Sequence, residues 1–206
     1  MKITLFNANR ILLCLTIASM FIMTYGCKDS TENESNSKSI NGKEINTEFV
    51  AKKPKPPEMD IHMAVISDNI KAIQQHILAG TDINQKDSYG GSSPLISAAL
   101  FGKHDIVALL LESGAKIDFQ NNDGATALHV AAFFCRSEIV QLLLKNNADK
   151  TIKNNRGSSA YDTVAGPFID VKPIYDMLGQ ALAPMGLTLD YDYLKVTRPQ
   201  IAALLK

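Results

Sequence analysis

The stretch GSSPLISAA, residues 91–99, returns 33 residues later as GATALHVAA, residues 124–132. Each copy is followed at the same distance by an Ile-Val pair and a Leu-Leu-Leu triplet, which end at residues 111 and 144. A fixed period of this length indicates a repeat architecture, in which no unit buries its own apolar face and each must stack on its neighbours.

Local signals place two helices in each unit. Pro94 suits the first turn of a helix, where its missing N–H costs nothing, and Ser93 and Thr126 can cap the helices that follow them. The Ile-Val and Leu-Leu-Leu residues fall on one stripe of a second helix. Gly80 and Gly114 follow that second helix, where a left-handed residue is favoured. We therefore expect helix-turn-helix units with extended loops projecting to one side.

This pattern resembles the ankyrin repeat, in which Thr-Pro-Leu-His-x-Ala-Ala opens the first helix and Ile-Val-x-Leu-Leu-Leu lies in the second. A divergent earlier copy begins at IHMA, residues 61–64, and a fourth copy weakens after Gly157. The resemblance covers about residues 58–166. It implies an all-α ankyrin-repeat solenoid of about 3.5 helix-turn-helix units.

Residues 167–206 match no family that we recognise, and we expect them to form a helical C-terminal cap over the last apolar face. Gly166 and Pro167 end the fourth unit early. A helix is expected from Asp170 to Leu182, with an apolar side formed by Ile174, Met177, Leu178 and Ala181. A last short helix is expected from Pro199 to Lys206, with the proline at its start.

The N-terminal residues predict a targeting signal. Lys2 and Arg10 precede an uncharged apolar stretch, residues 11–23. Its length suits a secretory signal peptide and is shorter than a membrane-spanning helix, which needs about 20 residues. The segment ending at Gly26 and Cys27 resembles a bacterial lipoprotein cleavage box. We expect residues 1–26 to be a lipoprotein signal peptide and Cys27 to carry the lipid. The alternatives are a short uncleaved membrane anchor and a plain signal peptide with an incidental cysteine.

Residues 27–57 are expected to be a disordered tether, because they are rich in Ser, Asn, Lys and Glu and carry few apolar side chains. Two acyl chains at Cys27 would hold the chain stably at a membrane. By resemblance to bacterial lipoproteins, Lys28 rather than Asp after the cysteine favours the outer membrane over the inner membrane. The expected location is the bacterial cell envelope, facing either the periplasm or the surface.

Composition excludes several classes of function. Lys+Arg and Asp+Glu both number 21, so the net charge is zero and no basic stripe points to nucleic acid. The cysteines, Cys14, Cys27 and Cys135, form neither a disulfide framework nor a CxxC metal site. No HExxH, GxSxG, Walker A or Rossmann pattern is present. We expect no catalytic residue, metal or cofactor.

The remaining reactive side chains have structural interpretations. By resemblance, His62 and His129 occupy the repeat position whose imidazole hydrogen-bonds loop backbone. Cys135 stands where Gly102 ends the equivalent helix of the preceding unit, and we expect it to be buried as a small apolar side chain. The competing hypothesis is a redox or hydrolytic envelope protein that uses Cys135 or His129.

What remains is a surface for another protein. By resemblance, the partner-binding positions on the first helices are Leu100, Phe101, Val130, Phe133 and Phe134, and those at the loop tips include Lys86, Tyr89, Phe119, Gln120, Asn122, Lys153 and Arg156. Phe101 and Phe134 are 33 residues apart and should line up on one concave face. They form a solvent-facing hot spot or, alternatively, pack as core. We expect a monomeric adaptor without catalysis; a scaffold and an inhibitor or immunity factor for a secreted enzyme both fit.

Overall fold

The computed structural model describes residues 53–206. The expected signal peptide, the lipid-attachment residue Cys27 and most of the tether lie outside the described residues, so these remain predictions. Within residues 53–206 the secondary structure is helical, with no strand.

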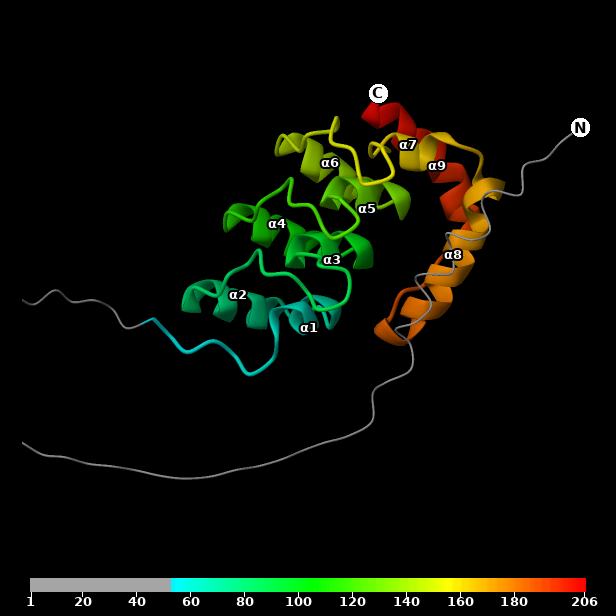
Figure 1. The fold of residues 1–206 in the computed structure, drawn as a ribbon. Helices are drawn as coiled ribbons and strands as arrows, with labels where there is room; N and C mark the ends of the chain where they lie inside the picture. Colours follow the sequence, from blue (N-terminus) through cyan, green and yellow to red (C-terminus); the bar gives the residue numbers. More distant parts are fainter. Residues whose placement is uncertain (1–52) are drawn as a thin grey trace, which may run out of the picture. The chain divides into compact units, whose positions relative to one another are not determined.

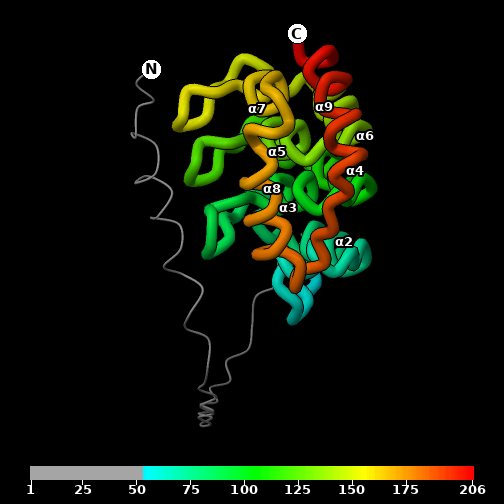
Figure 2. Tube along the Cα trace, turned by 90° about the vertical axis from the view of Figure 1, so that its right-hand side faces the viewer, coloured from blue at the N-terminus to red at the C-terminus, as the bar shows by residue number. Residues whose placement is uncertain are grey.

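Six of the described helices form three pairs that stack side by side (Figure 1). The first helices of the pairs are α1 (Ile61–Ile66), α3 (Pro94–Phe101) and α5 (Ala127–Phe133). The second helices are α2 (Ile70–Ala79), α4 (His104–Glu112) and α6 (Ser137–Lys145). The loops that connect successive pairs project to one side of the stack (Figure 2). The expected all-α repeat solenoid is confirmed.

The predicted helix ends are confirmed in detail. Ser93 caps α3 with Pro94 in its first turn, and Thr126 caps α5. Gly80 and Gly114 adopt the predicted left-handed backbone after α2 and α4, with φ of +77° and +85°. Asn147 takes the same conformation after α6, with φ of +63°. Asparagine tolerates this conformation better than most residues with a Cβ, which explains its use in place of glycine.

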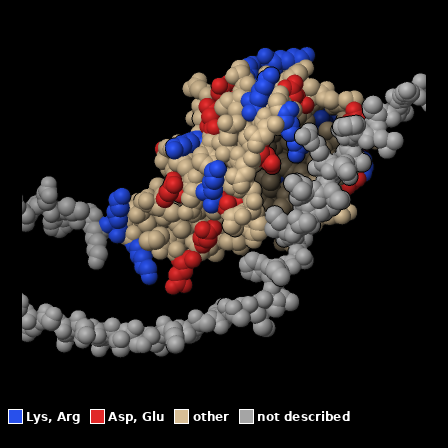
Figure 3. All heavy atoms as spheres, viewed as in Figure 1, with Lys and Arg blue, Asp and Glu red and all other residues tan. Residues whose placement is uncertain are grey.

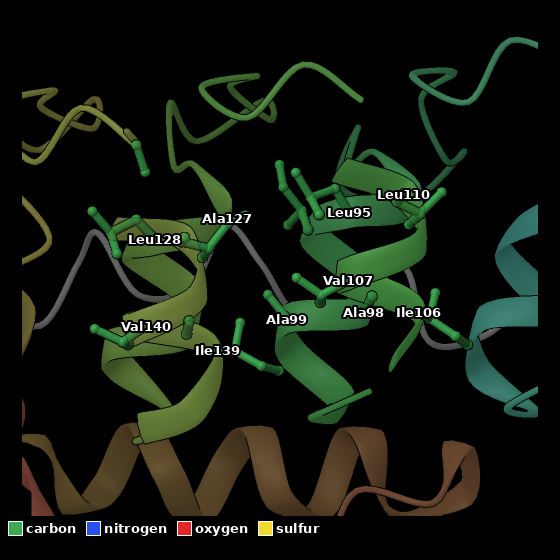
Figure 4. Close-up of a cluster of buried hydrophobic side chains, with 14 of the residues drawn as sticks. Leu95, Ala98, Ala99, Ile106, Val107, Leu110, Ala127, Leu128, Ile139 and Val140 are labelled. Carbon is green, nitrogen blue, oxygen red and sulfur yellow. The ribbon is translucent and has the colours of Figure 1, made fainter. Parts of the chain in front are cut away.

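The core is a row of small and aliphatic side chains shared between neighbouring units (Figure 4). Ala98 and Ala131 are fully buried between first helices, where α3 lies against α1 and α5. Their small size allows the helices to approach closely, and Leu110 and Leu143 fill the space between first and second helices.

We expect Leu110→Ala to lower the free energy of unfolding by about 2–5 kcal/mol, because Leu110 is fully buried and its loss leaves a cavity. Leu78→Ala is the matched control, since this leucine on α2 is 66% exposed and its truncation should change stability by about 0.5 kcal/mol or less. Urea unfolding followed by circular dichroism measures both. Equal losses would contradict the shared core.

The chain after the third pair continues through α7 (Asp162–Ala165), α8 (Phe168–Leu182), the 3₁₀ turn η2 (Ala183–Met185) and α9 (Tyr191–Leu205). α7 packs against α5, and α9 packs against α6 and α7. Ile201 and Leu205 of α9 are buried in the same core as the repeats. α7 and the end of α9 therefore act as the two helices of a fourth unit, with α8 inserted between them.

Two expectations for this region are wrong. Pro199 does not begin a helix, because α9 already starts at Tyr191, where the Asp190 carboxylate accepts the Tyr193 N–H at 3.0 Å and caps the first turn. Pro199 lies inside that helix. In α8, Ile174 and Met177 are exposed, while Tyr175 is buried. Apolar residues cover a broad side of α8, and the part of that side that packs is formed by Val171, Tyr175 and Leu178 rather than by Ile174 and Met177.

Candidate interaction surface

The first-helix residues expected to bind a partner are partly covered by the chain's own C-terminal helices. A second apolar cluster contains Leu100, Phe101, Val130, Phe133, Phe134 and Cys135, and its other members come from α8, α9 and the segment between them. Phe134 is only 4% exposed, so its expected solvent-facing position is wrong. Its alternative interpretation, as core, is the one the structure shows. A role of these residues in binding a partner stays a prediction.

Tyr175 holds α8 in place on this face. Its ring stacks on Phe133 with centroids 4.5 Å apart and meets Phe134 edge-on at 6.3 Å. Its hydroxyl donates to the Phe133 carbonyl oxygen and accepts a hydrogen bond of 2.9 Å from Arg198 Nη1. Burial raises the pKa of Tyr175 to about 12, so the hydroxyl keeps the proton that it donates.

Cys135 lies at the end of α5 in a left-handed conformation, with φ of +52°, and is fully buried. Its Sγ lies 3.9 Å from the Leu194 carbonyl oxygen of α9. Burial raises the pKa of Cys135 to about 11. The thiol is therefore protonated at neutral pH, which suits the expected apolar role and disfavours the competing redox hypothesis, because the thiolate is the reactive form.

We expect Cys135 in the folded protein to react with iodoacetamide at pH 7.5 at least about tenfold more slowly than in urea, because both its burial and its raised pKa suppress the thiolate. Mass spectrometry of the Cys135 peptide measures the rate separately from that of the other cysteines. Equal rates in the two states would restore the redox hypothesis.

His129 caps a helix and ties two units together. Its Nδ1 accepts the Thr126 N–H at 3.3 Å while its own backbone N–H donates to Thr126 Oγ1 at 3.5 Å, which completes a capping box. Its Nε2 lies 3.1 Å from the Ser158 carbonyl oxygen in the next loop. The expected hydrogen bond to loop backbone is confirmed here. For His62 it is wrong, since neither of its buried ring nitrogens has a hydrogen-bond partner.

Burial lowers the pKa of His129 below its ordinary value of 6.5, despite the opposing effect of its backbone hydrogen bonds. A lowered pKa means that the folded state favours the neutral ring, so this contribution to stability is full above pH 6.5 and is lost as the pH falls through the folded pKa. We expect an NMR titration of His129 to give a midpoint below 6.5 in the folded protein and near 6.5 in urea. A folded midpoint above the urea value would contradict this assignment.

The loop tips remain open to solvent and are ordered by one recurring turn. The side-chain oxygens of Asp87, Asn121 and Asn154 accept backbone N–H groups from their own loops at 2.8–3.2 Å. These three residues were not among the predicted site residues, although an Asx residue recurs in the sequence three or four positions before the loop glycine.

Hydrogen bonds also join each loop to the next. Asn122 N donates to the Gly90 carbonyl oxygen at 3.0 Å, and Asn155 N donates to the Asp123 carbonyl oxygen at 2.9 Å. The Gln120 side chain reaches the Lys153 carbonyl oxygen at 3.3 Å. The loops that follow α2, α4 and α6 are therefore joined to one another by hydrogen bonds, and we call this set of loops the loop ladder.

The expected loop-tip residues divide into two groups. Tyr89, 74% exposed, shares the outer surface of the ladder with Lys86, Gln120, Asn122, Lys153 and Arg156. Phe119 is instead half-buried against the repeat core, with Lys86 Nζ 5.7 Å above the centre of its ring. The ladder presents aromatic, amide and basic side chains to solvent, which are groups suited to protein recognition.

Charges of both signs are interspersed over the face seen in Figure 3, with no patch of one sign. Among residues 53–206, no three His, Cys, Asp or Glu side chains gather in a way that could hold a metal ion. In the same part of the chain, no helix combines the length and apolar character needed to cross a bilayer.

Comparison with known proteins gives the same repeat. A family model described as ankyrin repeats matches residues 61–154 in three copies. The chain is 36% identical over 66 residues to ankyrin repeat domain-containing protein 37 of Xenopus tropicalis, covering 32% of this chain and 40% of that protein. It is 40% identical over 71 residues to transient receptor potential cation channel subfamily A member 1 of Homo sapiens, covering 34% of this chain and 6% of that protein.

Among solved structures, the ankyrin repeat domain of Bcl-3 aligns with a TM-score of 0.49 and 31% identity, over 50% of this chain and 45% of that one. The chain spans less than half the length of each of these curated relatives. Residues 61–154 are three ankyrin repeats.

Proposed function

We propose that this protein is a lipid-anchored adaptor of the bacterial cell envelope that binds another protein through the loop ladder of its ankyrin repeats. Ankyrin repeats imply protein–protein interaction, and no catalytic constellation is evident in the described residues. The observation that carries the choice of surface is the pre-ordered ladder with exposed Tyr89 and Arg156. Tyrosine and arginine are over-represented among residues that dominate binding energy.

The ladder is favoured over the first helices because α8 already covers the ends of α3 and α5. A partner that used Phe133 or Phe134 would have to displace Tyr175 and break the hydrogen bonds of its buried hydroxyl. A partner that uses the ladder meets loops already held by hydrogen bonds, so little conformational entropy is lost on binding.

We expect a Tyr89→Ala/Arg156→Ala double variant to lose capture of the partner by about tenfold or more in a crosslinked pull-down from native envelopes, while its fold is unchanged. Leu78→Ala/Lys145→Ala is the matched control, because both residues are exposed on the second helices, away from the ladder.

A protein captured equally by wild type and both double variants would show that the ladder is not the binding surface. A partner lost only from the control variant would move the surface to the second helices. If no protein is captured in any case, the adaptor function itself is contradicted.

The membrane part of the proposal is supported by residues 1–57. Acylation at Cys27 would confine the folded repeats to a layer near the membrane and raise their effective concentration towards membrane-bound partners. Proline at positions 54, 56 and 57 would stiffen the last part of the tether before the first repeat.

We expect Cys27→Ser to abolish incorporation of labelled palmitate and to release the protein from washed membranes, because the thiol is the proposed acceptor of the lipid. Cys14→Ser is the control, since it replaces a cysteine within the same N-terminal region. Membrane fractionation and acyl labelling measure both variants. Retention of Cys27→Ser on membranes together with its label would contradict the anchor.

A further inference from the structure

A pocket of about 440 Å³ lies between α7 and α9, where the chain passes from α7 into α8. Its apolar lining includes Val164, Phe168, Pro199 and Ala202. It lies at the C-terminal end of the repeat stack, away from the loop ladder, and nothing in the proposed adaptor function makes use of it.

The same pocket is lined by Lys195, Arg198 and Lys206 and by no Asp or Glu. The ion pairs found among residues 53–206 are Lys103–Asp68, His104–Asp105 and Lys172–Asp176, so none of the pocket cations has a carboxylate partner there. The lining therefore carries three basic side chains and no acidic side chain.

Arg198 is the most unusual of the three, because it is only 2% exposed. Its Nη1 donates to the Tyr175 hydroxyl at 2.9 Å, its Nη2 donates to the Gly166 carbonyl oxygen at 3.3 Å, and its Nε has no acceptor. Both acceptors are neutral. A buried guanidinium is normally paired with an anion, because removing a charge from water costs several kcal/mol.

We propose that this pocket binds a small organic carboxylate with an apolar skeleton. The carboxylate would sit against the positive wall formed by Arg198 and Lys195, and the skeleton would lie on Val164, Phe168 and Ala202. A guanidinium presents planar, directional N–H donors that suit a carboxylate. The pocket volume falls within the range that takes small molecules. The apolar part of the lining distinguishes this ligand from a bare inorganic anion, which would leave those side chains unused.

The test is a two-dimensional NMR titration of the full chain, kept in detergent, with sodium benzoate as the probe. Benzyl alcohol is the neutral control of similar shape, and inorganic phosphate is the anion without an apolar part. We expect saturable shifts at the Phe168 and Ala202 amides with benzoate and about tenfold weaker binding of the other two compounds. Equal binding of benzyl alcohol, equal binding of phosphate, or no saturable shift with benzoate would each overturn the proposal.

Lys195→Met tests the charge without disturbing the fold, because Lys195 is exposed. We expect it to weaken benzoate binding by about tenfold. Lys150→Met is the matched control, since this lysine is also exposed but does not line the pocket. Equal affinities of the two variants would overturn the proposal.

Arg198→Met is expected to abolish benzoate binding. If that variant does not fold, the Lys195 comparison and the three-ligand titration of the wild type decide the question. Retained wild-type affinity in a folded Arg198→Met variant would overturn the proposal.

Discussion

The open end of the repeat stack is the constraint on which the rest of the structure depends. Each ankyrin unit buries its apolar face only against a neighbour, so the last unit needs a cover. α7 takes the place of a first helix but is only four residues long. The helix that pairs with α7 is the C-terminal end of α9, where Ile201 and Leu205 are buried in the repeat core. The chain between α7 and α9 must therefore leave the stack and return to it.

The segment between α7 and α9 determines which surfaces remain accessible to other molecules. α8 returns along the ends of the first helices, where Tyr175 joins Phe133, Phe134 and Arg198 in one buried contact. The first-helix face is thus occupied from within the chain, while the loop ladder on the projecting side stays exposed. The same segment creates the pocket between α7 and α9 and places a buried guanidinium in its wall. A single insertion accounts for the covered face, the exposed ladder and the charged pocket.

The repeat part of this fold could be predicted from the sequence because its signals are local. Pro94 and Ser93 specify a helix start, and Gly80 and Gly114 specify helix ends, through backbone preferences that need no distant contact. The cover could not be predicted in the same way. Phe134 occupies a repeat position that faces outward in an isolated stack, and only the contact with Tyr175, 41 residues later, makes it core. Ile174 and Tyr175 are both apolar enough to pack, and the choice between them depends on tertiary contacts. The loop ladder could be predicted in part. The Asx residues that order each loop can be recognised in the sequence, but the hydrogen bonds between loops cannot.

The most direct test of this account is whether α8 lies on the first-helix face in solution. Nuclear Overhauser contacts between the ring protons of Tyr175 and Phe133 report on that placement, because the two ring centroids are 4.5 Å apart. We predict strong cross-peaks between these rings in the full chain and weaker ones between Tyr175 and Phe134. Absence of both sets of cross-peaks in the folded protein would show that the face is free. The assignment of the partner surface to the loop ladder would then be contradicted.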